Sequence, residues 1–287
     1  MNNLALRLIF AAVAIPIIFF CLWWADWTRV ALICFLGAVA SWEWSRMVSK
    51  AYPGPNMFIV APFSTVLLTL GWVFNSGHFF GLPPVHGLIG LVALVVVSFY
   101  MIIAFIKVDI KFLFPWWVVQ LGAPLYLGLW GGLSVLILGS GHGLEYSYKF
   151  IVVMTAMWSC DTIAYFVGKF LTNRFIFGHH LMAPQISPKK TWEGAIGGTL
   201  FTMGWVAFWA IPAFNYTWSK GLVLGLALAI AGQAGDLLMS ALKRWTNTKD
   251  ASQIFVGHGG VLDRCDSFYL AAPMLVLFSG FFSGILS

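Results

Sequence analysis

Long apolar runs dominate this sequence and constrain what it can fold into. Runs of about 18 or more mostly apolar residues recur along the chain, and only 9% of its 287 residues are charged. A helix of about 20 residues spans a hydrocarbon core of about 30 Å and satisfies its own backbone hydrogen bonds there. The sequence therefore predicts an all-α, polytopic integral membrane protein with about nine transmembrane helices.

The nine predicted spans are separated by short segments that contain polar residues, glycine or proline. They cover residues 7–24, 30–46, 57–75, 84–106, 113–139, 149–170, 194–215, 220–242 and 267–286. The fifth run is too long for one straight span and contains Gly122, Pro124 and Gly128, so we expect a kink or a break in it. The first run is expected to be an uncleaved helix, because it is longer than the apolar part of a usual signal peptide.

The distribution of basic residues predicts the orientation of these spans. With the N-terminus inside, 13 of the 16 Lys and Arg residues fall on the inner side, and only Arg29, Lys149 and Lys220 fall outside. Because Lys and Arg are enriched in cytoplasmic loops, the N-terminus is expected in the cytoplasm and the C-terminus outside. The net charge of +6 fits this asymmetry and attraction to anionic lipids, so no nucleic-acid partner is expected.

Charged residues gather in residues 233–267, which run from the end of the eighth predicted span to the start of the ninth, at the expected cytoplasmic edge. Charges are costly at membrane depth and mark functional sites there, and glycines let backbone N–H groups approach an anion. Acids suit a metal, whereas bases and amides suit phosphate, so the stretch predicts a metal–nucleotide site. Its charged members and glycines are Asp236, Lys243, Arg244, Lys249, Asp250, Gly257, Gly259, Gly260, Asp263, Arg264 and Asp266.

Asp236 lies on a polar face of the eighth predicted helix, roughly 10 Å below its end. Gln233, Ser240 and Lys243 share that face at spacings of three and four residues. A carboxylate at this depth needs a proton, a basic partner or a metal. Asp263, where the chain re-enters the membrane, is the expected companion, and we predict that the two acids hold one magnesium ion.

The sixth span carries a second polar stripe, because Asp161, Tyr165 and Gly168 lie on one helical face with Lys169 beside them. The stripe is either part of the site or a buried aspartate satisfied by hydroxyl groups. Near the end of the second span, Glu43 precedes Arg46 by three residues. A local ion pair that anchors this helix is favoured there over a role of Glu43 in the site.

The loop before the seventh span predicts an anion site. It contains Ser187, Pro188, Lys189, Lys190 and Thr191, and its serine and threonine are candidate helix N-caps. Lysines beside the positive end of a helix attract an anion. We therefore expect this loop to bind phosphate.

The stretch from Ser240 to Asp266 resembles the signature of phosphatidate cytidylyltransferases, or CDP-diacylglycerol synthases. The matching residues are Ser240, Lys243, Arg244, Lys249, Asp250, Gly257, His258, Gly259, Gly260, Asp263, Arg264 and Asp266, together with Ser187–Gly194 and Asp161–Tyr165 upstream. Two residues depart from the family pattern: Asn247 replaces a usual glycine, and Val256 a usual proline. Both departures concern the shape of the loop.

This resemblance covers roughly residues 155 to 275, and the first 110 or so residues match only in being hydrophobic. It divides the chain into N-terminal transmembrane helices, residues 1–110, and a C-terminal catalytic region, residues 111–287. It implies transfer of a cytidylyl group from CTP to phosphatidate with release of pyrophosphate. It also implies a homodimer whose active site faces the cytoplasm, and a bacterial inner membrane is the expected location.

The sequence leaves open the exact function, the number of bound cations and the role of His258. A related membrane lipid cytidylyltransferase or a polyprenol kinase would use the same membrane–nucleotide chemistry. An ion-coupled transporter is less favoured, because the charges gather at one membrane face. The sequence also leaves open whether a second, monovalent cation such as potassium binds, and whether His258 donates a proton or is structural.

The predicted site residues fall into two groups. Catalytic roles are expected for Asp236, Asp263, Lys243, Arg264 and His258, with magnesium on Asp236 and Asp263. Substrate-binding roles are expected for Asp161, Tyr165, Ser187, Lys189, Lys190, Thr191, Ser240, Arg244, Lys249, Asp250, Gly257, Gly259, Gly260 and Asp266.

Overall fold

The computed structural model describes residues 3–51, 57–76, 110–138, 143–171, 180–254 and 259–285. The predicted fourth span, 84–106, and the residues Gly257 and His258 lie outside these ranges. Contacts divide the chain into two units, the first Met1–Ser147 with Lys243–Cys265 and the second Tyr148–Leu242 with Asp266–Ser287. This is a different division from the one at residue 110, which followed the extent of the recognisable motifs.

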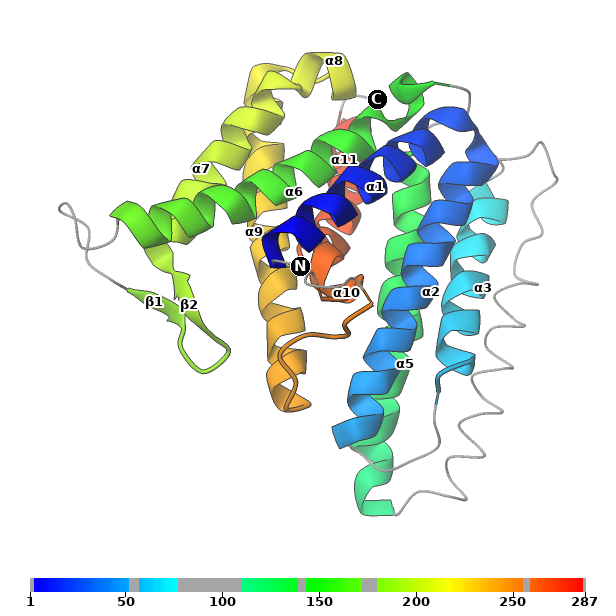
Figure 1. The fold of residues 1–287 in the computed structure, drawn as a ribbon. Coiled ribbons are helices and arrows are strands. Elements are labelled where there is room, and N and C mark those ends of the chain that lie inside the picture. The colour runs from blue at the N-terminus through cyan, green and yellow to red at the C-terminus, as the bar shows by residue number, and fades with distance from the viewer. Residues whose placement is uncertain are drawn as a thin grey trace. The chain divides into compact units, whose positions relative to one another are not determined.

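The first unit is built on three helices that pack along one another, α2, α3 and α5 (Figure 1). A buried hydrogen bond joins two of them, since the Thr65 hydroxyl lies 2.9 Å from that of Ser41. The elements of this unit are α1 (Asn3–Trp24), α2 (Asp26–Ala51), α3 (Val60–Ser76), α5 (Ile110–Ile137), a 3₁₀ turn (Leu144–Ser147) and α10 (Leu262–Cys265).

The corner between α1 and α2 is fixed by a fully buried arginine, Arg29. Its guanidinium donates to the carbonyl oxygens of Leu22 and Gly143, each at 2.8 Å, and forms an ion pair with Asp26 at 3.0 Å. A buried charge is tolerated when its donors are satisfied in this way. Arg29, one of the three basic residues of the predicted outer side, is therefore an internal structural group.

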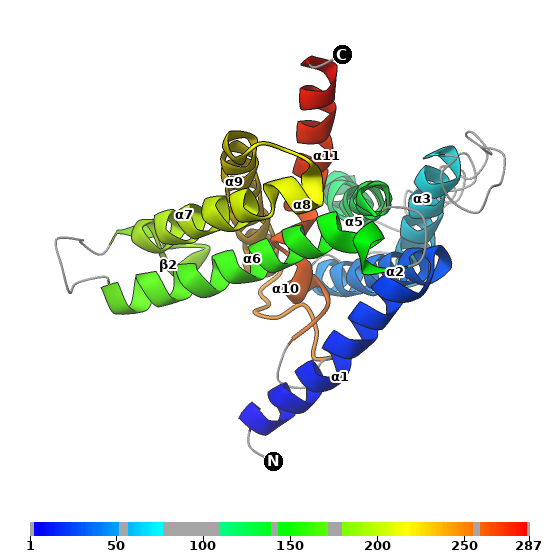
Figure 2. The same ribbon diagram turned by 90° about the horizontal axis from the view of Figure 1, so that it is seen from above.

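In the second unit, α6 and α7 lie side by side in both views (Figures 1 and 2). A Cβ on Gly198 would lie 2.8 Å from the carbonyl oxygen of Cys160, and one on Gly194 would overlap that of Ala164. Small residues allow helices to approach this closely. The elements are α6 (Tyr148–Phe166), a π-helical turn (Val167–Leu171), β1 (Leu181–Ala183), β2 (Ser187–Thr191), α7 (Trp192–Phe208), α8 (Ala210–Phe214), α9 (Trp218–Trp245) and α11 (Phe268–Ile285).

Apart from 84–106, each predicted span overlaps a helix of the structure. By length and composition, two helices within the described ranges could cross a membrane, Tyr148–Phe170 and Trp218–Trp245, and shorter apolar helices accompany them. The fifth run is not broken, because α5 is one helix of 28 residues, and a kink within it stays a prediction. A different predicted span, 194–215, is interrupted between α7 and α8. Pro212 has no N–H to bond the carbonyl of Phe208 there.

The described residues are mostly helical, as predicted, and the exception is a small antiparallel hairpin, β1–β2. It pairs Leu181 with Thr191 and Ala183 with Ser187, and Ile186 N–H closes its turn on Ala183 at 3.1 Å. Ser187 precedes a proline, and this position disfavours helix and favours an extended backbone. The hairpin therefore delivers an extended, lysine-containing strand directly to the start of α7.

Candidate functional site

The second unit contains a pocket of about 620 Å³ that collects the predicted polar residues of three separate elements. Residues of the sixth-span stripe and of the loop before the seventh span both line it. Its polar lining consists of Asp161, Tyr165 and Lys169 from the sixth span, Lys189, Lys190 and Thr191 from β2, and Gln233 and Asp236 from α9.

Local contacts hold the two lysines beside the start of α7. Thr191 is the N-cap of this helix, and its hydroxyl accepts a hydrogen bond from Gly194 N–H at 3.1 Å, as predicted. Ser187 is not a cap, because it lies in β2 opposite Ala183. The pocket therefore has two lysines and one helix N-terminus on the same side, an arrangement that attracts an anion.

The base of the hairpin is closed by Glu193 and His180. Trp192 N–H donates to the His180 carbonyl at 2.9 Å, and the imidazole Nδ1 lies 2.6 Å from Glu193 Oε1. The hydrogen bond with His180 lowers the pKa of the Glu193 carboxyl, which precedes the predicted span 194–215. Glu193 stays ionised in the first turn of α7, where a negative charge is favourable.

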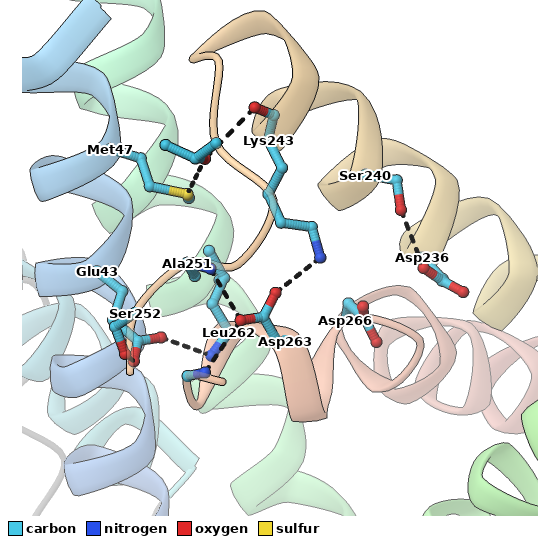
Figure 3. Close-up of polar contacts among 12 residues, drawn as sticks. Glu43, Met47, Asp236, Ser240, Lys243, Ala251, Ser252, Leu262, Asp263 and Asp266 are labelled. Atoms are coloured by element: carbon cyan, nitrogen blue, oxygen red, sulfur yellow. Dashed lines mark hydrogen bonds and ion pairs between the residues drawn. The ribbon is translucent and has the colours of Figure 1, made fainter. Parts of the chain in front are cut away.

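Asp236 finds its basic partner in Lys190, with which it forms an ion pair. Ser240, one turn further along α9, donates to Asp236 Oδ1 at 3.3 Å (Figure 3). The polar face predicted for this helix is thus confirmed for Gln233 and Asp236, which line the pocket, and for Ser240, which supports the acid. A carboxylate has about four lone-pair positions, so one amine and one hydroxyl leave room for a cation.

Asp161 lines the same pocket and accepts a hydrogen bond of 2.9 Å from the Ser267 hydroxyl. Asp161 therefore faces the pocket and is not a buried aspartate, although a hydroxyl does satisfy one of its oxygens. Its part in the site stays a prediction. Gln233 also lines the pocket and connects two helices there. Its side-chain amide donates to the Thr199 hydroxyl at 2.9 Å and to the Ala195 carbonyl at 3.2 Å. These two bonds tie α9 to α7 beneath the pocket.

In the first unit, Asp263 organises the signature loop. It accepts from Lys243 Nζ at 2.7 Å, from Ala251 N–H at 2.8 Å and from Gly260 N–H at 3.0 Å (Figure 3). Gly259 has φ +81°, a backbone conformation that favours glycine. Asp263 is therefore a structural centre of the loop as well as a predicted metal ligand.

Glu43 has contacts that sequence reasoning did not predict, because a local ion pair was favoured there over a role in the site. Its buried carboxylate accepts from Ser252 Oγ at 2.5 Å, Val261 N–H at 3.1 Å and Leu262 N–H at 2.8 Å (Figure 3). The expected ion pair with Arg46 is wrong, because that guanidinium is exposed and lies 5.3 Å from the Trp42 ring centroid. An acid in an apolar helix was the available signal, but its partners lie more than 200 residues away.

The departure at Asn247 also has a structural explanation. Asn247 has φ +53°, a left-handed conformation just after α9. Glycine adopts this conformation most easily, and asparagine is among the residues that tolerate it best. The loop shape at this position is therefore kept, whereas Val256 lies outside the described residues.

The remaining predicted residues are distributed over both units. Arg244 Nη1 donates to the Thr248 carbonyl at 3.4 Å, and Asp266 Oδ1 accepts from Ser267 N–H at 2.9 Å. Arg264 is exposed on α10, whereas Lys249 and Asp250 line a different pocket of the first unit.

Whether Asp236 and Asp263 share an ion stays a prediction, because they belong to different units. No group of three or more His, Cys, Asp or Glu side chains suited to a metal occurs among the described residues. Magnesium commonly needs only one or two carboxylates besides phosphate oxygens and water. Asp236 and Asp161, on one pocket, fit that smaller requirement.

The fold and the pocket define a class of protein: a helical protein with long apolar helices and a polar site suited to an anion and a cation. The chain belongs to the cytidylyltransferase family, whose sequence model matches residues 5–282. The match extends well beyond residues 155 to 275, where the motifs are recognisable. Apolar helices and this family together support an integral membrane location.

Similar proteins are named phosphatidate cytidylyltransferase. One from Bacillus subtilis is 40% identical over 143 residues, which is 50% of this chain and 50% of the relative. One from Rickettsia bellii is 39% identical over 158 residues, 52% of this chain and 65% of the relative. One from Pseudomonas aeruginosa is 31% identical over 263 residues, 84% of each. The chain thus spans about half to two thirds of the first two relatives and most of the third.

The Glu43 contacts generate a prediction about the signature loop. Glu43→Gln keeps the shape of the side chain but removes its charge, so the amides of Val261 and Leu262 lose their charged acceptor. Hydrogen bonds to charged groups contribute about 1.5–3 kcal/mol, so exchange of these two amides should accelerate by roughly tenfold or more. Hydrogen–deuterium exchange with mass spectrometry measures this directly.

The matched control is Glu145→Gln, which changes an exposed glutamate in the 3₁₀ turn of the same unit. It should leave exchange in residues 259–265 unchanged. Equal exchange in wild type and Glu43→Gln would show that Glu43 does not hold the loop.

Proposed function

We propose that this chain transfers a cytidylyl group from CTP to phosphatidate, giving CDP-diacylglycerol and pyrophosphate. The observation that carries the proposal is the pocket of the second unit, which brings Lys189 and Lys190 together with Asp161 and Asp236. Membership of the cytidylyltransferase family and the names of the relatives support the same reaction.

The reaction brings two anions together, and the pocket is suited to that task. Lys189, Lys190 and the N-terminus of α7 neutralise phosphate charge. A phosphate monoester has a second pKa near 6, so at pH 7 it is mostly dianionic and needs no strong general base. Its oxygen attacks the α-phosphorus of CTP, the bond from that phosphorus to the bridging oxygen breaks, and pyrophosphate leaves.

The lysine–aspartate pair gives the pocket two states. Without substrate, Lys190 neutralises Asp236. An incoming phosphate competes for the ammonium group, and Asp236 then requires another cation to remain ionised in apolar surroundings. Binding of the anionic substrate and of a metal at Asp236 therefore favour each other.

Magnesium is the proposed cofactor, with Asp236 and Asp263 as its ligands. When bound, it would neutralise the charge of the triphosphate and polarise its phosphorus–oxygen bonds. Asp161 is the alternative second ligand, because it lines the same pocket as Asp236. In the signature loop, Lys243 orients Asp263, and Arg264 of α10 is a proposed contact of a substrate phosphate.

The proposed topology has nine spans with the signature loop in the cytoplasm and the C-terminus outside. The helices supporting it are long and apolar, and the buried, carbonyl-bonded Arg29 leaves fewer free basic groups on the outer side. A site at the membrane surface is required, because one substrate is a lipid and the other is soluble. We further propose that the protein acts as a homodimer in a bacterial inner membrane.

The first test of this function is a reconstituted assay. Purified protein with CTP, magnesium and phosphatidate should release pyrophosphate in proportion to CDP-diacylglycerol, and chelation of divalent cations should stop the reaction. Thin-layer chromatography of labelled CTP together with a pyrophosphate assay measures both products. Release of CDP in place of pyrophosphate would indicate a kinase, and an inactive protein that moves ions would favour a transporter.

A second test separates the candidate metal ligands. Asp236→Asn removes the charge on the pocket side of α9, and turnover should fall by roughly a hundredfold or more while the helix content is kept. If Asp263 is the second ligand, Asp263→Asn should raise the magnesium concentration needed for half-maximal rate more than Asp161→Asn does. The reverse order would assign the second position to Asp161, and unchanged magnesium dependence in all three would place the metal elsewhere.

The topology has its own test. Reporter fusions at residues 250 and 287 should report opposite sides of the membrane, because the ninth predicted span separates them. Thiol labelling of single-cysteine variants at the same positions provides an independent measurement. Finding both positions on one side would contradict nine spans.

A further inference from the structure

The first unit has a pocket of its own, separate in composition from the one described above. It has a volume of about 650 Å³ and is formed by the end of α2 and the loop segment 249–254. Six of its eight lining side chains are polar or charged, including Arg46, Lys50, Lys249 and Asp250. The volume lies within the range of about 300–1,000 Å³ that is usual for ligand pockets.

The charges of this pocket are mostly positive and uncompensated. Arg46 and Lys50 are four residues apart on α2, so they lie on one helical face, and both are exposed. Among the residues that the structure describes, neither Lys50 nor Lys249 is part of an ion pair. Three cations thus face one acid, Asp250.

The loop wall of this pocket is held in place by buried contacts. Ser252, which lines the pocket, donates to Glu43 at 2.5 Å, and the neighbouring Ala251 N–H donates to Asp263 at 2.8 Å. Glu43 lies one turn before Arg46 on α2. The same helix therefore presents two of the cations and fixes the loop that carries the third, so the cationic groups are positioned before any ligand binds.

We propose that this pocket binds the polyphosphate group of a soluble ligand, either the triphosphate of the substrate CTP or the product pyrophosphate. The proposal rests on the proposed function for the identity of those two ligands. Several adjacent negative charges match three convergent cations better than a single phosphate does. Ala251 and Ile254 are the two lining residues with apolar side chains, whereas three lining residues carry a positive charge, and this favours the charge of a polyphosphate as the group that is recognised.

Membrane topology alone explains this cluster of basic residues less completely than polyphosphate binding does. Enrichment of basic residues in cytoplasmic segments explains why residues 46 and 50 are positively charged. It does not explain why they converge with Lys249 of the signature on one pocket. The proposal thereby gives the first 110 residues a direct part in substrate binding, although the recognisable motifs lie elsewhere in the chain.

The test is equilibrium binding to the full-length protein in lipid nanodiscs. The double variant Arg46→Gln/Lys50→Gln should bind CTP and sodium pyrophosphate roughly tenfold more weakly by isothermal titration calorimetry, with a smaller salt dependence. Asp250→Asn should tighten binding of both ligands, because it removes the negative charge from the lining. Lys149→Gln, which removes one exposed positive charge on the predicted outer side, is the control and should change neither affinity.

Kinetics distinguish the source of the phosphate. A raised KM for CTP with an unchanged KM for phosphatidate supports the nucleotide, and weaker product inhibition alone supports pyrophosphate. A raised KM for phosphatidate alone would assign the pocket to the lipid, and unchanged binding in the double variant would leave only a topological role; either outcome overturns the proposal. Failure of the proposed function is recognised separately, because wild-type protein would then form no CDP-diacylglycerol.

Discussion

A carboxylate among apolar helices needs donors around it, and this requirement shapes both units. Asp236 is matched by Lys190, Asp161 by Ser267, and Glu43 by the backbone of the signature loop. Each match joins segments far apart in sequence. These carboxylates therefore connect distant segments within each unit, and removing one partner of a buried pair leaves the other uncompensated.

Glu43 shows how the N-terminal helices can matter for chemistry that is carried elsewhere. Its carboxylate accepts from two consecutive backbone N–H groups at the start of α10, and Gly260 lies so close to it that a side chain there would overlap the acid. Asp263 then closes the loop from the other side through Gly260 N–H. The signature loop thus depends on an acid of α2 for its shape, which is consistent with a family match that begins at residue 5.

How well each feature could be predicted depends on how far apart in the sequence the interacting residues lie. Apolar runs predicted the helices, and helical spacing predicted the polar faces containing Asp161 and Asp236, because both signals are local. The hairpin was missed, because strands of three and five residues carry little pattern. The partners of Glu43 were missed because they lie 209 to 219 residues away, and the nearest visible cation, Arg46, suggested a local pair instead.

Two pockets of different lining suit a reaction between a lipid and a soluble nucleotide. The pocket of the second unit combines its lysines with apolar groups such as Ala164 and Met182, whereas most residues lining that of the first unit are polar or charged. A lipid phosphate carries acyl chains that need apolar surface, but a polyphosphate is best served by cations alone. Under the proposed function, the acyl chains of the lipid and the polyphosphate of the nucleotide are the parts by which the two substrates differ most, and the two pockets differ in the same respect.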